Sequence, residues 1–445
     1  MKKFGEWLEK TMRPIASKVA RNPYVETLSQ TFISLLPIIV IGAFALILSK
    51  SPVNYTGFAE NSYWYNFFKG WTDWTNANLQ TLKYVNTVTL GSLSLWVAIG
   101  IGYRWAKKYE ISELNMLTVV VVCFLIINSG VIDGGWSTTY FGGTGLFSAI
   151  VFSFLSAQLY RTLITKGIGR INFPATVPTS LTNAMSSMLP MAITFAATCI
   201  VAAIPAIFLQ TSIPALIMKI GAPLSVGIDN PLGISFVTIL GQISFWFGIH
   251  NSAVLSVFSP ILYANLSANA EAFAAGVSAS QVPFIVNQSF FYSFVGIGGA
   301  GATFGLVLLL LKSKSDTLRA VGKLSIIPAC FGINEPVIFG LPIMMNVTLL
   351  LPFLLVQVVN IIICYSAMAL NLLNKPIFYF GGTAPEILKA VLSNMDWRSI
   401  IYWIVAVAVD TLLYYPFFKL YERQVLEREA AEISETDKNL QISVE

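Results

Sequence analysis

The stretch TLSQTFISLLPIIVIGAFALILS, residues 27–49, is 23 residues long and contains no charged side chain. A helix needs about 20 mostly apolar residues to cross the hydrocarbon core of a bilayer, so this stretch is long enough for one crossing. Its apolar residues follow one another without the alternation that a transmembrane β-strand requires. The stretch therefore predicts a membrane-spanning helix.

Further charge-free stretches follow, and several are too long for one crossing and must include turns. They are residues 84–103, 114–132, 134–160, 171–218, 230–270, 272–311 and 336–374. A last apolar stretch, 399–418, is interrupted once, by Asp410. Of all 445 residues 55% are hydrophobic and 11% charged, against about 25% charged in ordinary soluble proteins. This composition excludes a soluble or disordered chain and predicts an all-α polytopic membrane protein.

Clusters of Lys and Arg set the expected orientation, because short loops rich in these residues stay in the cytoplasm. They occur within residues 1–26, at 104–108, 161–170 and 312–323, and after residue 418. If all are cytoplasmic, one crossing is missing before 312–323. The candidate is 210–235, a weak or broken span rich in proline and glycine. The total then reaches about ten spans with both termini in the cytoplasm, unless 312–323 violates the charge rule. The aromatic segment 50–83 is expected to be an outer loop at the membrane interface.

Ionisable residues inside apolar stretches are costly and usually functional. Three stand out: His250, the only histidine, in FWFGIHNS (245–252); Glu335, in FGINEPVIFGLP (331–342); and Asp410. Structural alternatives stay open for each: a histidine held by a backbone carbonyl, a glutamate paired with a buried base, and an aspartate that caps or pairs near the end of the last helix. Asp410 is also a candidate proton site.

The segment around Glu335 cannot form an uninterrupted helix, because it contains Gly332, Pro336, Gly340 and Pro342. Irregular backbone at membrane depth occurs only where it is buried in protein or lines a cavity. We therefore expect a re-entrant hairpin that starts from 312–323 and places Asn334 and Glu335 in a cavity, where an amide and a carboxylate suit a polyhydroxylated ligand.

The histidine segment offers complementary chemistry. Trp246 and Phe247 present aromatic faces for stacking on a sugar ring, His250 offers one donor and one acceptor, and Asn251 extends the polar patch. The glycine-rich run 296–303 favours close helix packing or backbone approach to a ligand over phosphate binding. The four cysteines are expected to be packing residues. No metal-ligand spacing or nucleotide motif is present, so no metal or cofactor is expected.

These segments together resemble the membrane (IIC) component of the bacterial phosphoenolpyruvate-dependent sugar phosphotransferase system, lactose/cellobiose/diacetylchitobiose family. The resemblance is carried by FWFGIH (245–250), the glycine run 296–303 and GINEPVIFGLP (332–342), and more weakly by PATVP (174–178) and LPF (351–353). It covers essentially the whole chain. One departure is Asn346-Val347, where the family pattern has Asn-Pro; it is expected to loosen the start of the next helix.

The resemblance implies homodimers in which the N-terminal half makes much of the dimer contact and the C-terminal half holds the sugar with two re-entrant hairpins. It implies that His250 and Glu335 bind the hydroxyl to be phosphorylated and assist catalysis, with Asn334 and Trp246 lining the site. Secondary lining candidates are Phe247, Asn251, Gly299 and Gly301. The expected segments are 1–26, a cytoplasmic amphipathic helix; 27–220, the N-terminal transmembrane domain; 221–420, the sugar-binding transmembrane domain; and 421–445, a cytoplasmic tail.

The expected function is a permease of the bacterial inner membrane for a β-linked disaccharide of the cellobiose, diacetylchitobiose or lactose type. The sugar is phosphorylated by a separate IIB phosphocysteine protein, because the chain has no room for a fused IIB domain. The permease is not catalytic alone. The alternative is a proton-coupled secondary sugar transporter in which His250, Glu335 and Asp410 relay protons.

Overall fold

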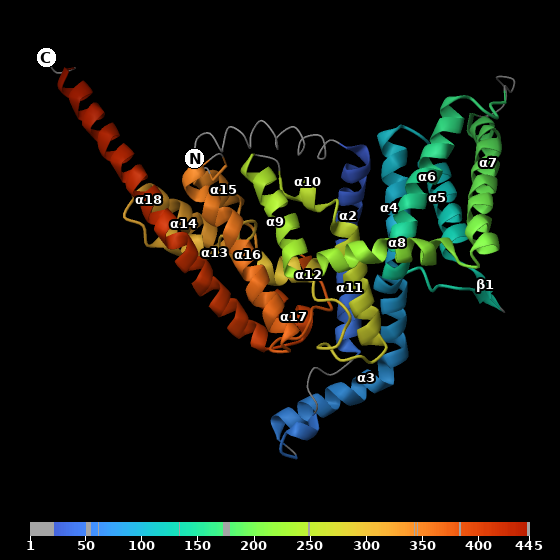
Figure 1. The fold of residues 1–445 in the computed structure, drawn as a ribbon, viewed down its shortest axis with the longest axis horizontal. Coiled ribbons are helices and arrows are strands. Elements are labelled where there is room, and N and C mark those ends of the chain that lie inside the picture. The colour runs from blue at the N-terminus through green and yellow to red at the C-terminus, as the bar shows by residue number, and fades with distance from the viewer. Residues whose placement is uncertain are drawn as a thin grey trace. The chain divides into compact units, whose positions relative to one another are not determined.

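The computed structural model describes residues 22–49, 55–60, 62–132, 134–171, 179–247, 250–341, 343–344, 346–381 and 384–442. Within these ranges the chain is mainly helical (Figure 1), which confirms the all-α part of the predicted fold class. The strand pairing found there is one short antiparallel pair, β1 (Val131–Ile132) with β2 (Gly135–Trp136). The amphipathic helix expected within 1–26 and the motif 174–178 lie almost wholly outside the described residues.

The chain divides into two compact units, and the first comprises Asn22–Gly227 and Ser259–Asn287. Its long helices are α2 (Pro23–Leu48), α3 (Tyr63–Val88), α4 (Leu93–Lys108), α5 (Glu113–Asn128), α6 (Leu146–Thr165), α7 (Thr179–Phe208), α8 (Ile213–Ile228) and α11 (Ser259–Ala274). Short turns of 3₁₀-helix are η1 (Tyr55–Gly57), η2 (Leu90–Ser92) and η3 (Gly143–Gly145). Trp105 is fully buried in a cluster with the rings of Tyr24 and Phe154, whose centroids lie 4.9 and 5.1 Å from it.

The second unit comprises Ile228–Phe258 and the residues from Gln288 onward. Its elements are α9 (Pro231–Trp246), α10 (Ser252–Leu255), α12 (Gln288–Phe290), the π-helix η4 (Phe291–Val295), α13 (Phe304–Leu311), α14 (Asp316–Ala329), α15 (Glu335–Gly340), α16 (Val347–Ala369), α17 (Glu386–Asn394) and α18 (Arg398–Ile442). Residues 259–287, expected to belong with the C-terminal domain, thus pack in the first unit. The functional division at residue 220 stays a prediction.

Six helical segments of the described chain are long and apolar enough to cross a membrane: Pro23–Leu48, Tyr63–Lys108, Gly143–Thr165, Ala184–Phe208, Val347–Ala369 and Arg398–Ala431. A seventh results if α8 and α9 count as one bent span. The helix break between them falls within 210–235, where a weak span was expected, and Asn230 caps the new start by accepting a hydrogen bond from Gly233 N–H at 2.9 Å. The count of ten spans stays a prediction.

Two segments differ in conformation from what was expected. The aromatic segment predicted as an outer loop is largely helical, since α3 begins at Tyr63 and exposes Tyr63 and Trp64. The start of α16 is firmly capped despite the missing proline, because Asn346 Oδ1 accepts hydrogen bonds from the N–H groups of Thr348 and Leu349 at 3.0 and 3.4 Å.

The region around Glu335 has the helix–break–helix form that its glycines and prolines predict. α14 ends at Ala329, Gly332 adopts φ +80°, and α15 starts at Glu335 with Pro336 in its first turn, where proline is tolerated. A Cβ placed on Gly340 would lie 2.6 Å from a methyl group of Val321, so α15 folds back onto α14. The two helices thus form a hairpin, and its re-entrant position in the membrane stays a prediction.

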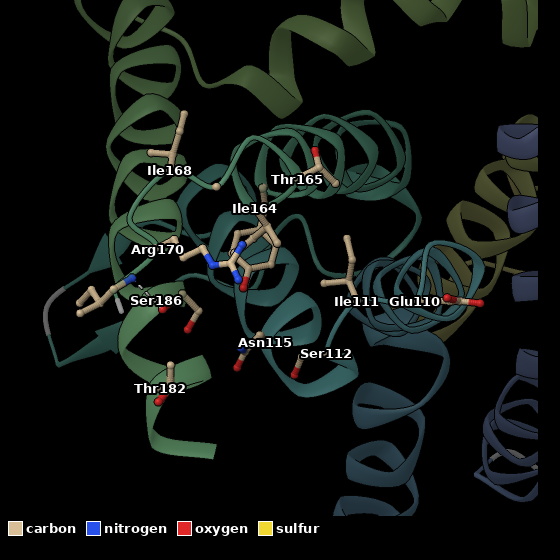
Figure 2. Close-up of a pocket in the computed structure, with 14 residues that line it drawn as sticks. Glu110, Ile111, Ser112, Asn115, Ile164, Thr165, Ile168, Arg170, Thr182 and Ser186 are labelled. Atoms are coloured by element: carbon tan, nitrogen blue, oxygen red, sulfur yellow. Dashed lines mark hydrogen bonds between the residues drawn. The ribbon is translucent and has the colours of Figure 1, made fainter. Parts of the chain in front are cut away.

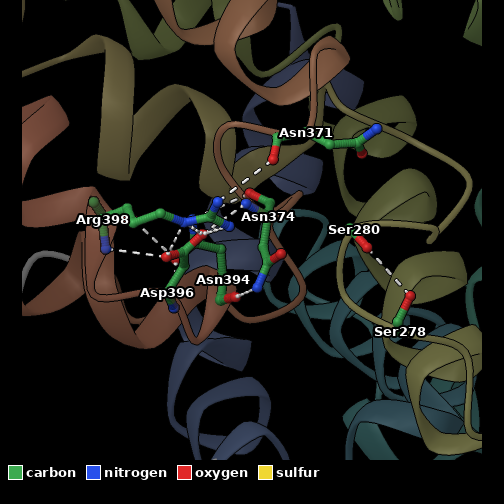
Figure 3. A network of polar contacts seen from close by, with 8 residues as sticks. Ser278, Ser280, Asn371, Asn374, Asn394, Asp396 and Arg398 are labelled. Atoms are coloured by element: carbon green, nitrogen blue, oxygen red, sulfur yellow. Dashed lines mark hydrogen bonds and ion pairs between the residues drawn. The ribbon is translucent and has the colours of Figure 1, made fainter.

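A polar network anchors the start of α18 (Figure 3). The buried carboxylate of Asp396 accepts hydrogen bonds from Arg398 Nε at 2.9 Å, Arg398 Nη2 at 2.7 Å and the backbone N–H of Asn374 at 3.0 Å. Asn394 Nδ2 donates to the carbonyl of Asn374 at 3.1 Å. These bonds fix the connection from α16 to α17 and α18, which carries one wall of the site described next.

Candidate functional site

A cavity of about 190 Å³ lies within the second unit. Five regions contribute to it: the end of α9 with the α9–α10 connection, η4 with the glycine run after it, the α14–α15 break, α16, and α17 with the segment leading into it. Five of the residues singled out from the sequence line it together: His250, Asn251, Gly299, Asn334 and Glu335. Residues up to 85 positions apart in the sequence thus meet at one place.

His250 and Glu335 present exposed side chains to this cavity. The imidazole lies beside the ring of Phe245, with 5.1 Å between the ring centroids. Glu335 stands at the first position of α15, and its backbone follows the irregular Cys330–Asn334 turn. An accessible carboxylate and imidazole in one cavity can bind hydroxyl groups and exchange a proton with them.

Asn334 is buried, and its amide fastens the glycine run to the α14–α15 break. Its Nδ2 donates to Ala300 O at 2.6 Å and to Thr303 Oγ1 at 3.2 Å. A Cβ on Gly299 would lie 2.7 Å from Asn334 Cγ, and Gly299 has φ +100°, so only glycine fits this approach. The geometry therefore gives Asn334 a positioning task in addition to lining the cavity.

Two charged residues of this site, Glu386 and Lys389, were not predicted from the sequence. Both are only 3% exposed, and both line the cavity from α17. Glu386 Oε2 accepts a hydrogen bond from Gly298 N–H at 2.6 Å, and Lys389 Nζ lies 3.4 Å from the carbonyl of Phe331, to which it donates. α17 thereby ties the glycine run to the α14–α15 break.

Glu386, at the start of α17, also contacts the α14–α15 break at two points. The backbone N–H of Glu386 donates to Cys330 O at 2.8 Å, and a Cβ on Gly332 would lie 2.7 Å from Glu386 Oε1. Helix α17 lies outside the candidate membrane spans. Burial raises the pKa of Glu386 to about 7, although the positive charge of Lys389 and the hydrogen bond from Gly298 N–H both act to lower it. The sequence signal was available as an acid and a base three residues apart, which share a helix face.

Aromatic side chains form another part of the lining, and they differ from the pair expected. Phe245, Phe291, Tyr292 and Tyr379 line the cavity, and the rings of Tyr292 and Tyr379 are 5.7 Å apart. Gln357 adds an amide whose Nε2 donates to Gly299 O at 3.4 Å, and Gln242 donates to its Oε1. The cavity thus combines aromatic faces with hydrogen-bonding groups, as sugar sites do.

Trp246, Phe247 and Gly301 are not among the described residues that line the cavity. Trp246 and Phe247 are buried in an apolar cluster with Leu350, and Trp246 Nε1 donates to Asn346 O at 3.2 Å. Gly301 lies against the ring of Phe353. Trp246 and Phe247 support the α9–α16 packing, and Gly301 packs the glycine run against α16. A substrate contact by any of them stays a prediction.

Comparison with known proteins identifies the fold and the family. Residues 29–356 match the family described as Phosphotransferase system, EIIC. The chain belongs to this family. It is 32% identical to the Lichenan permease IIC component of Bacillus subtilis (strain 168), over 96% of each chain, and 29% identical to the PTS system cellobiose-specific EIIC component of Geobacillus stearothermophilus, over 97% of each.

A solved structure supports the same assignment. The crystal structure of the transporter ChbC, the IIC component from the N,N'-diacetylchitobiose-specific phosphotransferase system, superposes with a TM-score of 0.85 at 29% identity, covering 95% of this chain and 99% of ChbC. The resemblance inferred from the motifs is confirmed, and the chain is a multi-pass membrane permease of the phosphotransferase system.

Asp410 of this EIIC protein does not lie near a helix end, because α18 continues to Ile442. Its side chain is fully buried, and Oδ2 accepts a hydrogen bond from Asn360 Nδ2 at 3.2 Å. Asn360 also donates to Val295 O at 3.3 Å, next to the cavity-lining Gly296. Asp410 therefore pairs with an amide behind the site and does not cap the helix.

A larger cavity, about 720 Å³, lies in the first unit of the EIIC protein. Figure 2 shows Arg170 extending into it, and small polar side chains such as Ser112, Asn115 and Ser186 around it. The residues singled out from the sequence are absent from its described lining. The convergence of an acid, an imidazole and aromatic rings favours the smaller cavity as the functional site.

Proposed function

We propose that this EIIC protein binds a β-linked disaccharide of the cellobiose, diacetylchitobiose or lactose type and carries it across the bacterial membrane. It then presents the sugar for phosphorylation by a separate IIB phosphocysteine protein. The observation that carries the proposal is the meeting of His250, Asn334 and Glu335 with aromatic rings in one cavity. The names of similar proteins support the sugar class, since they specify lichenan, cellobiose, lactose and oligo-beta-mannoside.

The proposed chemistry places the sugar hydroxyl between His250 and Glu335. As that hydroxyl oxygen attacks phosphorus, its proton passes to Glu335 acting as general base, and the phosphorus–sulfur bond of the IIB phosphocysteine breaks to release a thiolate. His250 orients the hydroxyl by a hydrogen bond. Asn334, Glu386 and Lys389 hold the two loops that shape the cavity, and so set the distance over which the proton moves.

The partner assignments form part of the proposal. A cytoplasmic IIB protein supplies the phosphoryl group; the lactose-specific EIICB component of Staphylococcus epidermidis, of which this chain covers 72%, carries a name that joins the C and B parts. We further propose a homodimer formed through the N-terminal half, with both termini in the cytoplasm. Asn22–Gly227, which contains most of that half, folds as part of its own compact unit.

Reconstitution tests the proposal. Proteoliposomes containing this chain alone, or together with phosphorylated IIB protein, are supplied with radiolabelled cellobiose, lactose or diacetylchitobiose. We expect phosphorylated sugar to accumulate only when phosphorylated IIB protein is present, and competition among the three disaccharides ranks them. Concentrative uptake of unmodified sugar driven by a proton gradient, without IIB protein, would favour the proton-coupled transporter instead.

A further inference from the structure

A basic groove lies in the first unit, where α2 begins and α4 ends. It has a volume of about 370 Å³ and is lined by Glu26, Thr27, Gln30, Tyr103, Arg104, Lys107 and Lys108. Both helices belong to segments long and apolar enough to span a membrane, and the groove lies at the ends of both. It is therefore placed where a lipid headgroup meets a helix end.

The groove carries an excess of positive charge. Lys108 Nζ pairs with Glu26 Oε2 at 2.5 Å, which uses the carboxylate of the groove. Among the described residues, Arg104 donates to neutral groups, from Nη1 to Gln30 Oε1 at 2.9 Å and from Nη2 to Ser34 Oγ. Lys107 lies over the ring of Tyr103, 4.8 Å from its centroid. The described lining of the groove thus contains three cations and one carboxylate, a net positive charge, and Glu113, outside that lining, adds a negative charge near Lys107.

An exposed apolar stripe continues from the groove along α2. Ile33, Pro37, Ile41 and Phe44 recur every three or four residues, which places them on one face of the helix. Ile33 is 60% exposed, Ile41 54% and Phe44 46%. Gln30 and Ser34, the two partners of Arg104, lie on this same face: Gln30 lines the groove, and Ser34 lies between Ile33 and Pro37. The positive groove and the apolar stripe are thus one continuous surface.

We propose that this surface binds one anionic phospholipid, with its phosphate against Arg104 and Lys107 and an acyl chain along the α2 stripe. Basic pockets between transmembrane helices suit such headgroups, and each Lys or Arg near the surface adds to the attraction. If these Lys and Arg residues served only to set the orientation of the chain in the membrane, positive charge would be enough, and neither the groove nor the apolar stripe beside it would be needed. A free phosphate ion would use the groove and leave the stripe without a role.

Lipid binding to the purified, delipidated full-length protein in detergent tests the headgroup. The probes are dioleoylphosphatidylglycerol, dioleoylphosphatidylcholine and inorganic phosphate, and native mass spectrometry gives the affinities. We expect phosphatidylglycerol to bind at least about tenfold more tightly than phosphatidylcholine, and the double variant Arg104→Gln, Lys107→Gln to lose about tenfold or more of that affinity. Glu26→Gln should tighten binding, because it removes the carboxylate from the groove. Lys166→Gln, on another basic segment, is the matched control and should change nothing.

A second arm tests the stripe. Ile33→Ser with Ile41→Ser should weaken phosphatidylglycerol binding several-fold and leave the weak affinity for inorganic phosphate unchanged. Equal affinity for the two lipids, or an unaffected Arg104–Lys107 double variant, would overturn the proposal. The proposal would also be overturned if inorganic phosphate bound as tightly as phosphatidylglycerol or more tightly. Efficient disulfide formation between two copies carrying Ile41→Cys in nanodiscs would show a second copy on the stripe, and would equally reject the lipid.

Discussion

Glu386 accepts a hydrogen bond from the backbone N–H of Gly298 at 2.6 Å, across 88 positions of the sequence. The bond joins α17 to the glycine run that carries Gly299 into the cavity, and Lys389 of the same helix reaches the other loop at Phe331. One short helix therefore sets the spacing of the two loops that hold the proposed sugar site.

Replacing this carboxylate should loosen both loops. In Glu386→Ala the buried Gly298 N–H loses its partner, which costs about 1–3 kcal/mol. We expect a lower unfolding temperature of the purified protein and a several-fold weaker affinity for the disaccharide, with Glu386→Gln intermediate because its amide oxygen still accepts. Glu427→Ala, an exposed glutamate of α18, is the control. Unchanged stability and affinity in Glu386→Ala would remove the bridging role.

Glu335 and His250 should be needed for transfer and not for folding. Their side chains are accessible in the cavity, so Glu335→Gln and His250→Ala should abolish phosphorylation-coupled uptake while the protein keeps the proposed dimer and its unfolding temperature. Glu335→Gln removes the proposed base but keeps a hydrogen-bonding group of similar size, so sugar binding should be less affected than transfer. Normal transport by either variant would refute its place in the site.

Asp410→Asn should keep at least partial transport. The buried side chain meets Asn360 behind the cavity, and an asparagine of the same shape can still accept from that amide. Uptake into proteoliposomes with phosphorylated IIB protein measures the effect, with the unfolding temperature as the check on folding. Complete loss of uptake in a folded protein would instead indicate a proton-carrying role for Asp410.

The network at Asp396 should make stability depend on pH. Although burial opposes it, hydrogen bonds from Arg398 and from Asn374 N–H hold the pKa of Asp396 below its usual range. A carboxylate whose pKa is lowered on folding stabilises the protein above the unfolded pKa, near 3.9, and loses that contribution as pH falls through the lower folded value. Asp396→Asn should therefore lower the unfolding temperature at pH 7, and its deficit should shrink below about pH 4.

The control for this experiment is Asp316→Asn, because the Asp316 side chain is 95% exposed. It should unfold within a degree or so of the parent protein at pH 7, since exposed ion pairs contribute about 0–1 kcal/mol. A deficit of Asp396→Asn that stayed constant down to pH 3 would show that packing, and not the charge of Asp396, stabilises the start of α18.

Local features of the sequence predicted the membrane class, the position of the helix break and the family. Charge-free stretches identified the membrane class, and Gly332, Pro336 and Gly340 located the broken helix before α16. Both depend on properties of neighbouring residues: the length of apolar chain that a bilayer requires, and the backbone angles that proline and glycine allow. The motifs around His250 and Glu335 also led to the correct family.

The lining of the site was decided by the tertiary structure. Trp246 and Phe247 follow the chain toward His250, yet they turn into the packing against Leu350, and Phe245, Tyr292 and Tyr379 line the cavity instead. Sequence proximity does not determine which face of a turn a side chain occupies.

The burial of Glu386 and Lys389 likewise could not be predicted from the local sequence. They lie between the apolar stretches 336–374 and 399–418, and folding buries them against loops more than 50 residues away. The sequence by itself therefore determined the membrane class, the helix break and the family, because these follow from local composition and motif. Only the tertiary structure decided which charges are buried and which rings face the cavity, since both depend on contacts between distant segments.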